Sequence, residues 1–322
     1  MDNRVKQRLE NTSLVVGSFI LADRLNKLTG LALKPISAKF VFNKVSEPIV
    51  DEFKKAANEA KLVKPEIFGD INIIDFGTNS KAYIDIFRKR LKLLNESYDK
   101  LIDRASKDST KKIYQNLHKR SVKRLKTKFR MIKNGENAFY SYAPKSIMIN
   151  MNKLPGAIFH EFGHHYNSKV YSAEVLKAMS YFRISKVRTL LTAPILMTAV
   201  LTRKQDKVDK DTKDKGSLQK GANLVRNFVK NYAWFFAGSL PLTFVFEEWQ
   251  ASIIAGKVGS KLLKSPEAKN ILRRNNIGSM ISYAKIPLAA GLSVYLTNKI
   301  SDKIFEQNLF GIDRDKSLTM KK

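Results

Sequence analysis

The sequence has no cysteine and only four histidines among its 322 residues. Without cysteine the chain has no disulfide scaffold, Cys-based zinc ribbon, iron–sulfur site or thiol nucleophile. Acidic residues are also scarce, with 29 Asp and Glu against 59 Lys and Arg, so the formal net charge is +30. A charge this large predicts attraction to an anionic partner, such as nucleic acid, an acidic lipid surface or an acidic protein.

Long apolar runs are few. Thr189–Thr202 and Asn231–Phe246 are uncharged, but they are shorter than the roughly 20 residues that a spanning helix needs. Asn275–Asn298 is long enough and contains one charge, Lys285. Lys and Arg next to the short runs can extend them by snorkelling. Two interpretations therefore stay open, buried core helices or helices that enter a membrane.

The N-terminus lacks a clear cleavable signal. Arg4, Lys6 and Arg8 precede an uncharged run from Asn11 to Ala22, but no small-x-small cleavage site follows before Asp23. We therefore expect a membrane-associated or cytoplasmic protein rather than one secreted through a cleaved signal.

The remaining pattern predicts an α+β fold that is predominantly helical. Lys39–Asn43 and Asn72–Phe76 are rich in β-branched and aromatic residues and are expected to be short strands. Between them, Ser46, Glu47 and Pro48 begin a helix that we expect to run to about Lys61. Lys81 to about Lys133 has apolar residues at three- and four-residue spacing, which predicts long helices.

Charge is concentrated in two stretches. Lys111–Lys133 holds ten basic residues and no acidic one, which is typical of a solvated basic face or of a surface that contacts anionic lipid or nucleic acid. Arg203–Lys220 mixes seven basic with four acidic residues and is expected to be an exposed insertion between two apolar segments.

The motif with the clearest chemistry is H-E-x-x-H, formed by His160, Glu161 and His164. The two histidines are four residues apart, hence on one face of a helix, where two imidazoles can hold one metal ion. Glu161 then lies beside the metal, in position to take a proton from a bound water. His165 points away from that face, and we expect it to support or pack against the site.

A catalytic zinc needs a third protein ligand, and no histidine follows His165. The third ligand must therefore be a carboxylate. Glu248 is the better candidate, because Ala251 and Ala255 stand at i+3 and i+7 and would let its helix pack tightly against the metal-binding helix. Glu247 has bulkier residues in those places and stays the alternative.

These residues resemble the gluzincin metallopeptidases, and most of all the HtpX and CAAX prenyl-protease family. Residues 160–164 match H-E-x-G-H, and residues 248–252 resemble E-x-x-A-D with Ser252 in place of the usual Asp. The resemblance implies zinc ligands His160, His164 and Glu248, with Glu161 as the general base. It also implies a zincin-like metallopeptidase core, in which a small sheet lies beside the H-E-x-x-H helix.

Ahead of the metal helix, Asn137, Ala138 and Phe139 resemble the family's N-A-F edge-strand motif. The resemblance implies that Phe139 to about Asn150 forms a strand along which an extended substrate lies. It also implies two membrane helices between H-E-x-x-H and the third ligand, an interval that holds the two short apolar runs here. Ser252 departs from the pattern, since a hydroxyl orients a ligand histidine less firmly than a carboxylate.

The sequence thus predicts a zinc-dependent endopeptidase acting on proteins or peptides. We expect an apolar and basic segment over 1–45, the metallopeptidase domain over 46–302 and a basic tail over 303–322. A binding protein is the alternative, in which Lys111–Lys133 contacts nucleic acid and the zinc site is structural or vestigial. A third possibility keeps the peptidase and makes it soluble, with the apolar runs as core.

Overall fold

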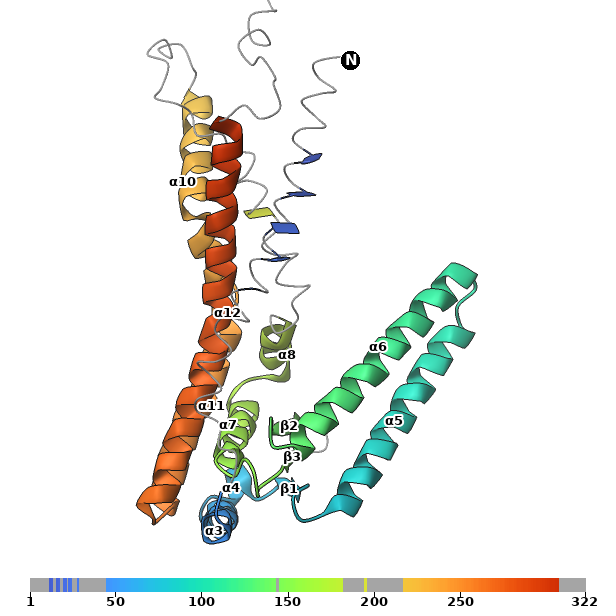
Figure 1. The fold of residues 1–322 in the computed structure, drawn as a ribbon, viewed down its shortest axis with the longest axis vertical. Helices are drawn as coiled ribbons and strands as arrows, with labels where there is room; N and C mark the ends of the chain where they lie inside the picture. The colour runs from blue at the N-terminus through green and yellow to red at the C-terminus, as the bar shows by residue number, and fades with distance from the viewer. Residues whose placement is uncertain are drawn as a thin grey trace, which may run out of the picture. The chain divides into compact units, whose positions relative to one another are not determined.

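A computed structural model describes residues 45–142, 145–181 and 217–306 of the chain, with scattered positions between 12 and 28 and residues 194 and 195. The strand expected at Lys39–Asn43, almost all of Thr189–Thr202 and most of Arg203–Lys220 lie outside the described residues. So do most of the N-terminal segment and residues 307–322. The described part is predominantly helical and contains one three-stranded sheet (Figure 1), so the predicted α+β class is confirmed.

The described helices are α3 (Glu47–Val63), α4 (Pro65–Phe68), α5 (Ser80–Asp103), α6 (Asp108–Lys133), α7 (Ala157–Val170), α8 (Ala173–Tyr181), α10 (Ser217–Ser239), α11 (Leu242–Leu262) and α12 (Pro266–Glu306). The strands are β1 (Asn72–Asp75), β2 (Phe139–Tyr142) and β3 (Lys145–Ile149). By internal contacts the chain divides into two compact units. One comprises Ser37–Leu176 and Glu247–Met280, and it contains the H-E-x-x-H motif.

The sheet of this unit has the order β1-β3-β2. β1 is parallel to β3, with Asn72 opposite Ser146, and β2 is antiparallel to β3, with Phe139 opposite Met148. β3 is therefore the central strand, and four of its five residues are buried. Among the described residues, no strand pairs with the outer edge of β2.

Alternation along β3 gives the sheet two different faces. Ile147 and Ile149 belong to the main core, together with Phe53 of α3 and with Phe159 and Phe162 of α7. On the opposite face, Met148 belongs to a second core with Phe76, Phe129 and Ile132. α7 and the α5–α6 pair therefore cover opposite faces of the sheet.

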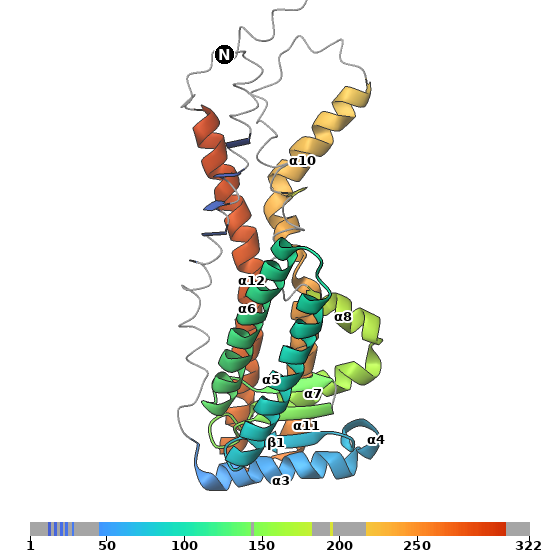
Figure 2. The ribbon, with the colours of Figure 1, turned by 90° about the vertical axis from the view of Figure 1, so that its right-hand side faces the viewer.

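The predicted helices agree closely with α3, α5 and α6. α3 begins after Ser46 and buries Ile49, Phe53, Ala57 and Ala60 at helical spacing. The long helical region is broken by a turn at 104–107, so that α5 and α6 lie side by side and antiparallel (Figures 1 and 2). Gly135, with φ of 72°, ends the turn after α6 in a left-handed conformation that glycine adopts without strain.

Two expectations about element boundaries are wrong. The single strand expected from Phe139 to Asn150 is two antiparallel strands, since β2 ends at Tyr142 and β3, which begins at Lys145, pairs back against it. The run Asn231–Phe246 is not one helix, since α10 ends at Ser239 and α11 begins at Leu242, beside Pro241. In addition, Ser217–Lys220 of the expected insertion are the first residues of α10.

The other unit contains α10 and the second half of α12. These helices approach closely at two glycines: a Cβ on Gly291 would lie 2.9 Å from the Trp234 carbonyl oxygen, and one on Gly238 would lie 3.1 Å from that of Pro287. Such contacts are typical of helices that pack through small residues. Within the described part of the chain, one helical stretch, Pro266–Ile300, is long and apolar enough to cross a membrane.

Candidate metal centre

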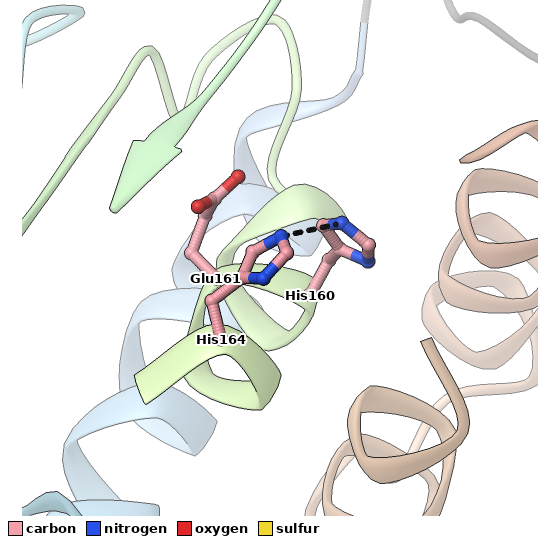
Figure 3. Close-up of side chains that lie close together, drawn as sticks. All are labelled: His160, Glu161 and His164. Atoms are coloured by element: carbon pink, nitrogen blue, oxygen red, sulfur yellow. Dashed lines mark hydrogen bonds between the residues drawn. The ribbon is translucent and has the colours of Figure 1, made fainter. Parts of the chain in front are cut away.

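The H-E-x-x-H motif lies on α7, and residues 157–165 of this helix are all buried. The apolar residues Ile158, Phe159 and Phe162 pack into the main core. Their packing fixes the orientation of the helix, so that His160 and His164 face α11 rather than the core. Figure 3 shows the two imidazoles together on α7, with Glu161 beside them.

Three atoms from α7 and α11 come together at one point. His160 Nε2 lies 3.2 Å from His164 Nε2. Glu248 Oε2 lies 3.3 Å from the first and 3.2 Å from the second. The three groups form a nearly equilateral triangle of two imidazole nitrogens and one carboxylate oxygen, and all three side chains are buried.

This triangle fits a zinc ion. Zinc binds nitrogen and carboxylate oxygen at about 2.0–2.1 Å in tetrahedral geometry, which places its ligand atoms about 3.3 Å apart. Two histidines and one glutamate also match the donor set of catalytic zinc sites, in which the fourth position is left for water. The residues present therefore fit zinc in both spacing and chemistry.

Glu247 contacts a different ring nitrogen of His164 than Glu248 does. Its Oε1 accepts a hydrogen bond of 2.7 Å from His164 Nδ1, on the far side of the ring from Nε2. Asn167 Nδ2 donates to the same carboxylate oxygen and to the backbone carbonyl of Glu247, each at 3.1 Å. Glu247 thus orients His164, whereas Glu248 reaches the nitrogens that would face a metal.

Ser252 stands where the resembled family usually has an Asp, and it contacts His160. Its Oγ lies 3.1 Å from His160 Nδ1 and is hydrogen-bonded to it. Both histidines therefore have an anchored Nδ1. At His164 the carboxylate of Glu247 accepts a hydrogen bond from a proton-bearing Nδ1, whereas the hydroxyl of Ser252 can pair with either tautomer of His160. His164 is thus hydrogen-bonded to a carboxylate, that of Glu247, whereas His160 is hydrogen-bonded to the hydroxyl of Ser252.

The close packing expected around Glu248 is present. Ala251 and Ala255, at i+3 and i+7, are both fully buried, and Ala255 belongs to the main core that includes Phe159 and Phe162 of α7. Small side chains at these positions let the backbone of α11 come near α7.

Glu161 is buried and lies next to the ligand histidines. Its carboxylate, His160 and His164 offer ligand atoms within 4.8 Å of one another. Glu161 follows His160 directly in the helix, so its side chain points in another direction. It lies beside the imidazoles of His160 and His164 rather than between them (Figure 3). That is the place expected of a proton acceptor for a metal-bound water.

The charges of the site favour a cation. Burial by itself would lower the pKa of His164, but the charge of Glu248 and the hydrogen bond to Glu247 raise that pKa well above its ordinary value. A buried pair of carboxylates therefore stabilises positive charge at this point. The same two carboxylates would stabilise a divalent cation, which carries more positive charge than a protonated histidine.

His165 is a packing residue, as expected, with polar partners that the sequence did not reveal. It is fully buried, and its Nδ1 lies 2.8 Å from the Tyr140 hydroxyl of β2. Its Nε2 lies 2.6 Å from the Ile67 carbonyl and 3.1 Å from Asp70. His165 thus ties α7 to the edge strand and to α4.

The three residues Asn137, Ala138 and Phe139, expected to bind the substrate, lie in three different environments. Asn137 is exposed, Ala138 is buried in the main core, and Phe139 begins β2 and packs against the second core. Lys128 Nζ lies 2.7 Å from the centroid of the Phe139 ring. Two of the three side chains thus support the fold.

The basic stretch Lys111–Lys133 makes up nearly all of α6. Lys119, Lys123, Lys126 and Arg130 follow one another along an exposed side of the helix. His118, in the same helix, is bonded through Nε2 to Asn95 of α5 at 2.8 Å and stacks on Tyr98, so it joins the two helices.

Comparisons with known proteins found no match. No protein-family model, no curated protein and no solved structure matches the chain.

Proposed function

We propose that this chain is a zinc-dependent endopeptidase of the gluzincin type, related to the HtpX and CAAX prenyl-protease family. The observation that supports it most is the triangle of His160 Nε2, His164 Nε2 and Glu248 Oε2, with sides of 3.2–3.3 Å. These three residues are the zinc ligands in this proposal, and Glu161 is the general base.

The chemistry that zinc supplies when bound is polarisation of the scissile carbonyl and acidification of a water molecule. Glu161 accepts a proton from that water and delivers it to the amine nitrogen of the departing product. Its burial next to the histidines supports this role, since a carboxylate in a site with little solvent keeps the proton it has taken for the leaving group.

The substrate is a polypeptide in extended conformation. It lies along the outer edge of β2, where backbone N–H and C=O groups can pair with those of a peptide. β2 is linked to the metal-binding helix through the Tyr140–His165 hydrogen bond. Such pairing recognises the peptide backbone rather than its side chains. The proposal therefore predicts an endopeptidase that accepts substrates with many different side chains.

Membrane association is part of the proposal. Pro266–Ile300 supports it by length and composition. Large apolar side chains exposed on α10 and α12, among them Phe228, Phe235 and Leu288, support it further, because exposed apolar surface of this kind marks a membrane or partner contact. Resistance of the full-length chain to carbonate extraction from membranes is the expected result.

The test is zinc content and casein cleavage of the purified full-length chain and three variants. Wild type is expected to hold one zinc and cleave casein. Glu161→Gln should keep the zinc and lose activity by about 10²- to 10⁴-fold, the usual contribution of a general base. Glu248→Ala should lose both. Glu59→Gln, an exposed change on α3, is the matched control and should resemble wild type.

Two outcomes would contradict the proposal. Full activity in Glu161→Gln removes Glu161 as the base. Undiminished zinc in Glu248→Ala removes that ligand and leaves Glu247 as the alternative.

A further inference from the structure

A cavity lies on the face of the sheet opposite α7. It is open to solvent, has a volume of about 800 Å³ and is lined by residues of α5, α6, β1 and β3. Met148 and Ile74 line it from β3 and β1, and both side chains belong to the second core rather than the main core. Its size is that of a pocket for a small molecule, for which about 300–1,000 Å³ is usual.

Part of the lining is apolar, and we call this part the apolar base. It consists of Ile86, Leu93 and Leu94 of α5 and Leu125 of α6, together with Ile74 and Met148. Leu93 is about half exposed, so part of this apolar surface is open to a ligand. A surface of this kind binds an aliphatic chain, because burying each methylene contributes about 0.8 kcal/mol.

Four cations also line the same cavity. Lys89 and Arg90 line it from α5, and Arg124 and Lys128 line it from α6. No Asp or Glu of the described chain is among the lining residues. Lys89, Arg90 and Arg124 form no ion pair with any residue that the structure describes, and Lys128 lies over the Phe139 ring.

Arg90 is the most informative of these cations. It is half buried, and its Nη2 donates a hydrogen bond of 3.1 Å to Ser141 Oγ of β2. Burial of the side chain lowers the pKa of Arg90. A guanidinium has five N–H donors in a planar fork, and a single hydroxyl leaves most of them for an oxyanion.

We infer that this cavity, defined by Arg90 and Arg124 beside Ile74, Leu94 and Met148, binds an oxyanion carried on an aliphatic chain. The arginines hold the carboxylate or phosphate group, and the apolar base takes the chain. The site is separate from the metal centre and does not depend on the proposed peptidase activity.

The experiment measures binding of decyl phosphate, below its micellar concentration, to the full-length chain. 1-Decanol supplies the chain without the charge, and inorganic phosphate supplies the charge without the chain. Decyl phosphate is expected to bind at least tenfold more tightly than either. Equal binding of decanol or of inorganic phosphate would overturn the inference.

Variants then locate the site. Arg90→Gln is expected to weaken binding of decyl phosphate by about 10- to 100-fold, the range of a hydrogen bond to a charged group. Arg88→Gln, an exposed change of the same charge on the same helix, should alter it less than twofold. Equal losses in the two variants would show attraction to general positive charge and would overturn the inference.

A change at the apolar base gives an independent test if Arg90→Gln does not fold. Leu93→Gln alters a half-exposed side chain and should weaken decyl phosphate binding about tenfold while leaving the affinity for inorganic phosphate unchanged. Unchanged decyl phosphate binding in this variant would count against the cavity.

The source of the ligand is distinguished with vesicles. Phosphatidylglycerol vesicles should compete with monomeric decyl phosphate if a lipid supplies the oxyanion, and should not compete if the natural ligand is a free amphiphile. Binding of the vesicles alone, without binding of the monomer, would indicate a surface contact and overturn the inference. Glu161→Gln should bind decyl phosphate as wild type does, which separates this site from the metal centre.

Discussion

Gly163 of α7 and Ala251 of α11 are in near backbone contact. A Cβ placed on Gly163 would lie 2.5 Å from the Ala251 Cα, closer than real Cβ atoms approach another atom. Gly163 stands between Glu161 and His164, and Ala251 stands three residues after Glu248. The same contact that brings the two helices together therefore sets the distance between the histidines and the third ligand.

Gly163→Ala is accordingly expected to destroy the metal site without touching a ligand. The added methyl must push α11 away, and the triangle of 3.2–3.3 Å would open. Zinc content should fall well below one per chain. Gly256→Ala on α11 is the control, because the nearest atom to its added Cβ would be 3.6 Å away. Full zinc in Gly163→Ala would show that the two helices can separate without loss of the site.

Glu247→Gln is expected to weaken zinc binding by about 10- to 100-fold, the usual effect of losing a partner that orients a ligand histidine. The amide can still accept from His164 Nδ1, but without the negative charge. Competition with a chelator measures the change, with Glu267→Gln as an exposed control on α12. A complete loss of zinc would instead identify Glu247 as a direct ligand.

Asp70→Asn is expected to lower stability in a pH-dependent way. Burial opposes ionisation of Asp70, but hydrogen bonds from Lys145 and Lys169 outweigh it and lower the pKa to about 2. Because the folded-state pKa is below the value of about 4 in an unfolded chain, this stabilisation is complete above pH 4 and is lost as the pH falls through 2.

The measurement is denaturant unfolding of wild type and Asp70→Asn at several pH values. The difference between them should shrink steadily below pH 4. Asp85→Asn, an exposed change on α5, should show no such trend. A difference that is constant with pH would mean that Asp70 contributes through packing rather than charge.

Gly291→Val is expected to disturb the pair formed by α10 and α12. Its Cβ would meet the Trp234 carbonyl oxygen at 2.9 Å, and a β-branched side chain adds further atoms at the same place. Overpacking of this kind costs about 1–3 kcal/mol. Thermal unfolding of the purified chain should therefore begin several degrees lower, and an unchanged midpoint would contradict the glycine contact between these helices.

Much of the site could be predicted from the sequence because its signals are local. The spacing of His160 and His164 by four residues decides that they share one helix face. The rarity of histidine makes a carboxylate the third ligand, and the alanines after Glu248 favour it over Glu247. The geometry of the triangle agrees with that choice. α3, α5 and α6 were likewise predictable from helical periodicity.

Other features depend on contacts between distant segments. The packing of α11 on α7 brings Glu247 to His164 Nδ1 and Ser252 to His160 Nδ1. It also brings Asn167 to the carboxylate of Glu247. The division into β2 and β3 was missed because the single strand was implied by the family resemblance, and the pairing of the two strands is a tertiary contact. The cavity of Arg90 has no sequence motif, since its lining comes from α5, α6 and two strands.

The sequence by itself determined that His160 and His164 share one face of α7, because a helix places residues i and i+4 together whatever surrounds it. It also determined the excess of positive charge. Only the tertiary structure decided which glutamate lies at the Nε2 atoms of both histidines and where a group of cations lies beside an apolar surface. Those relationships require packing of helices far apart in the chain, and packing depends on the shapes of all the side chains between them.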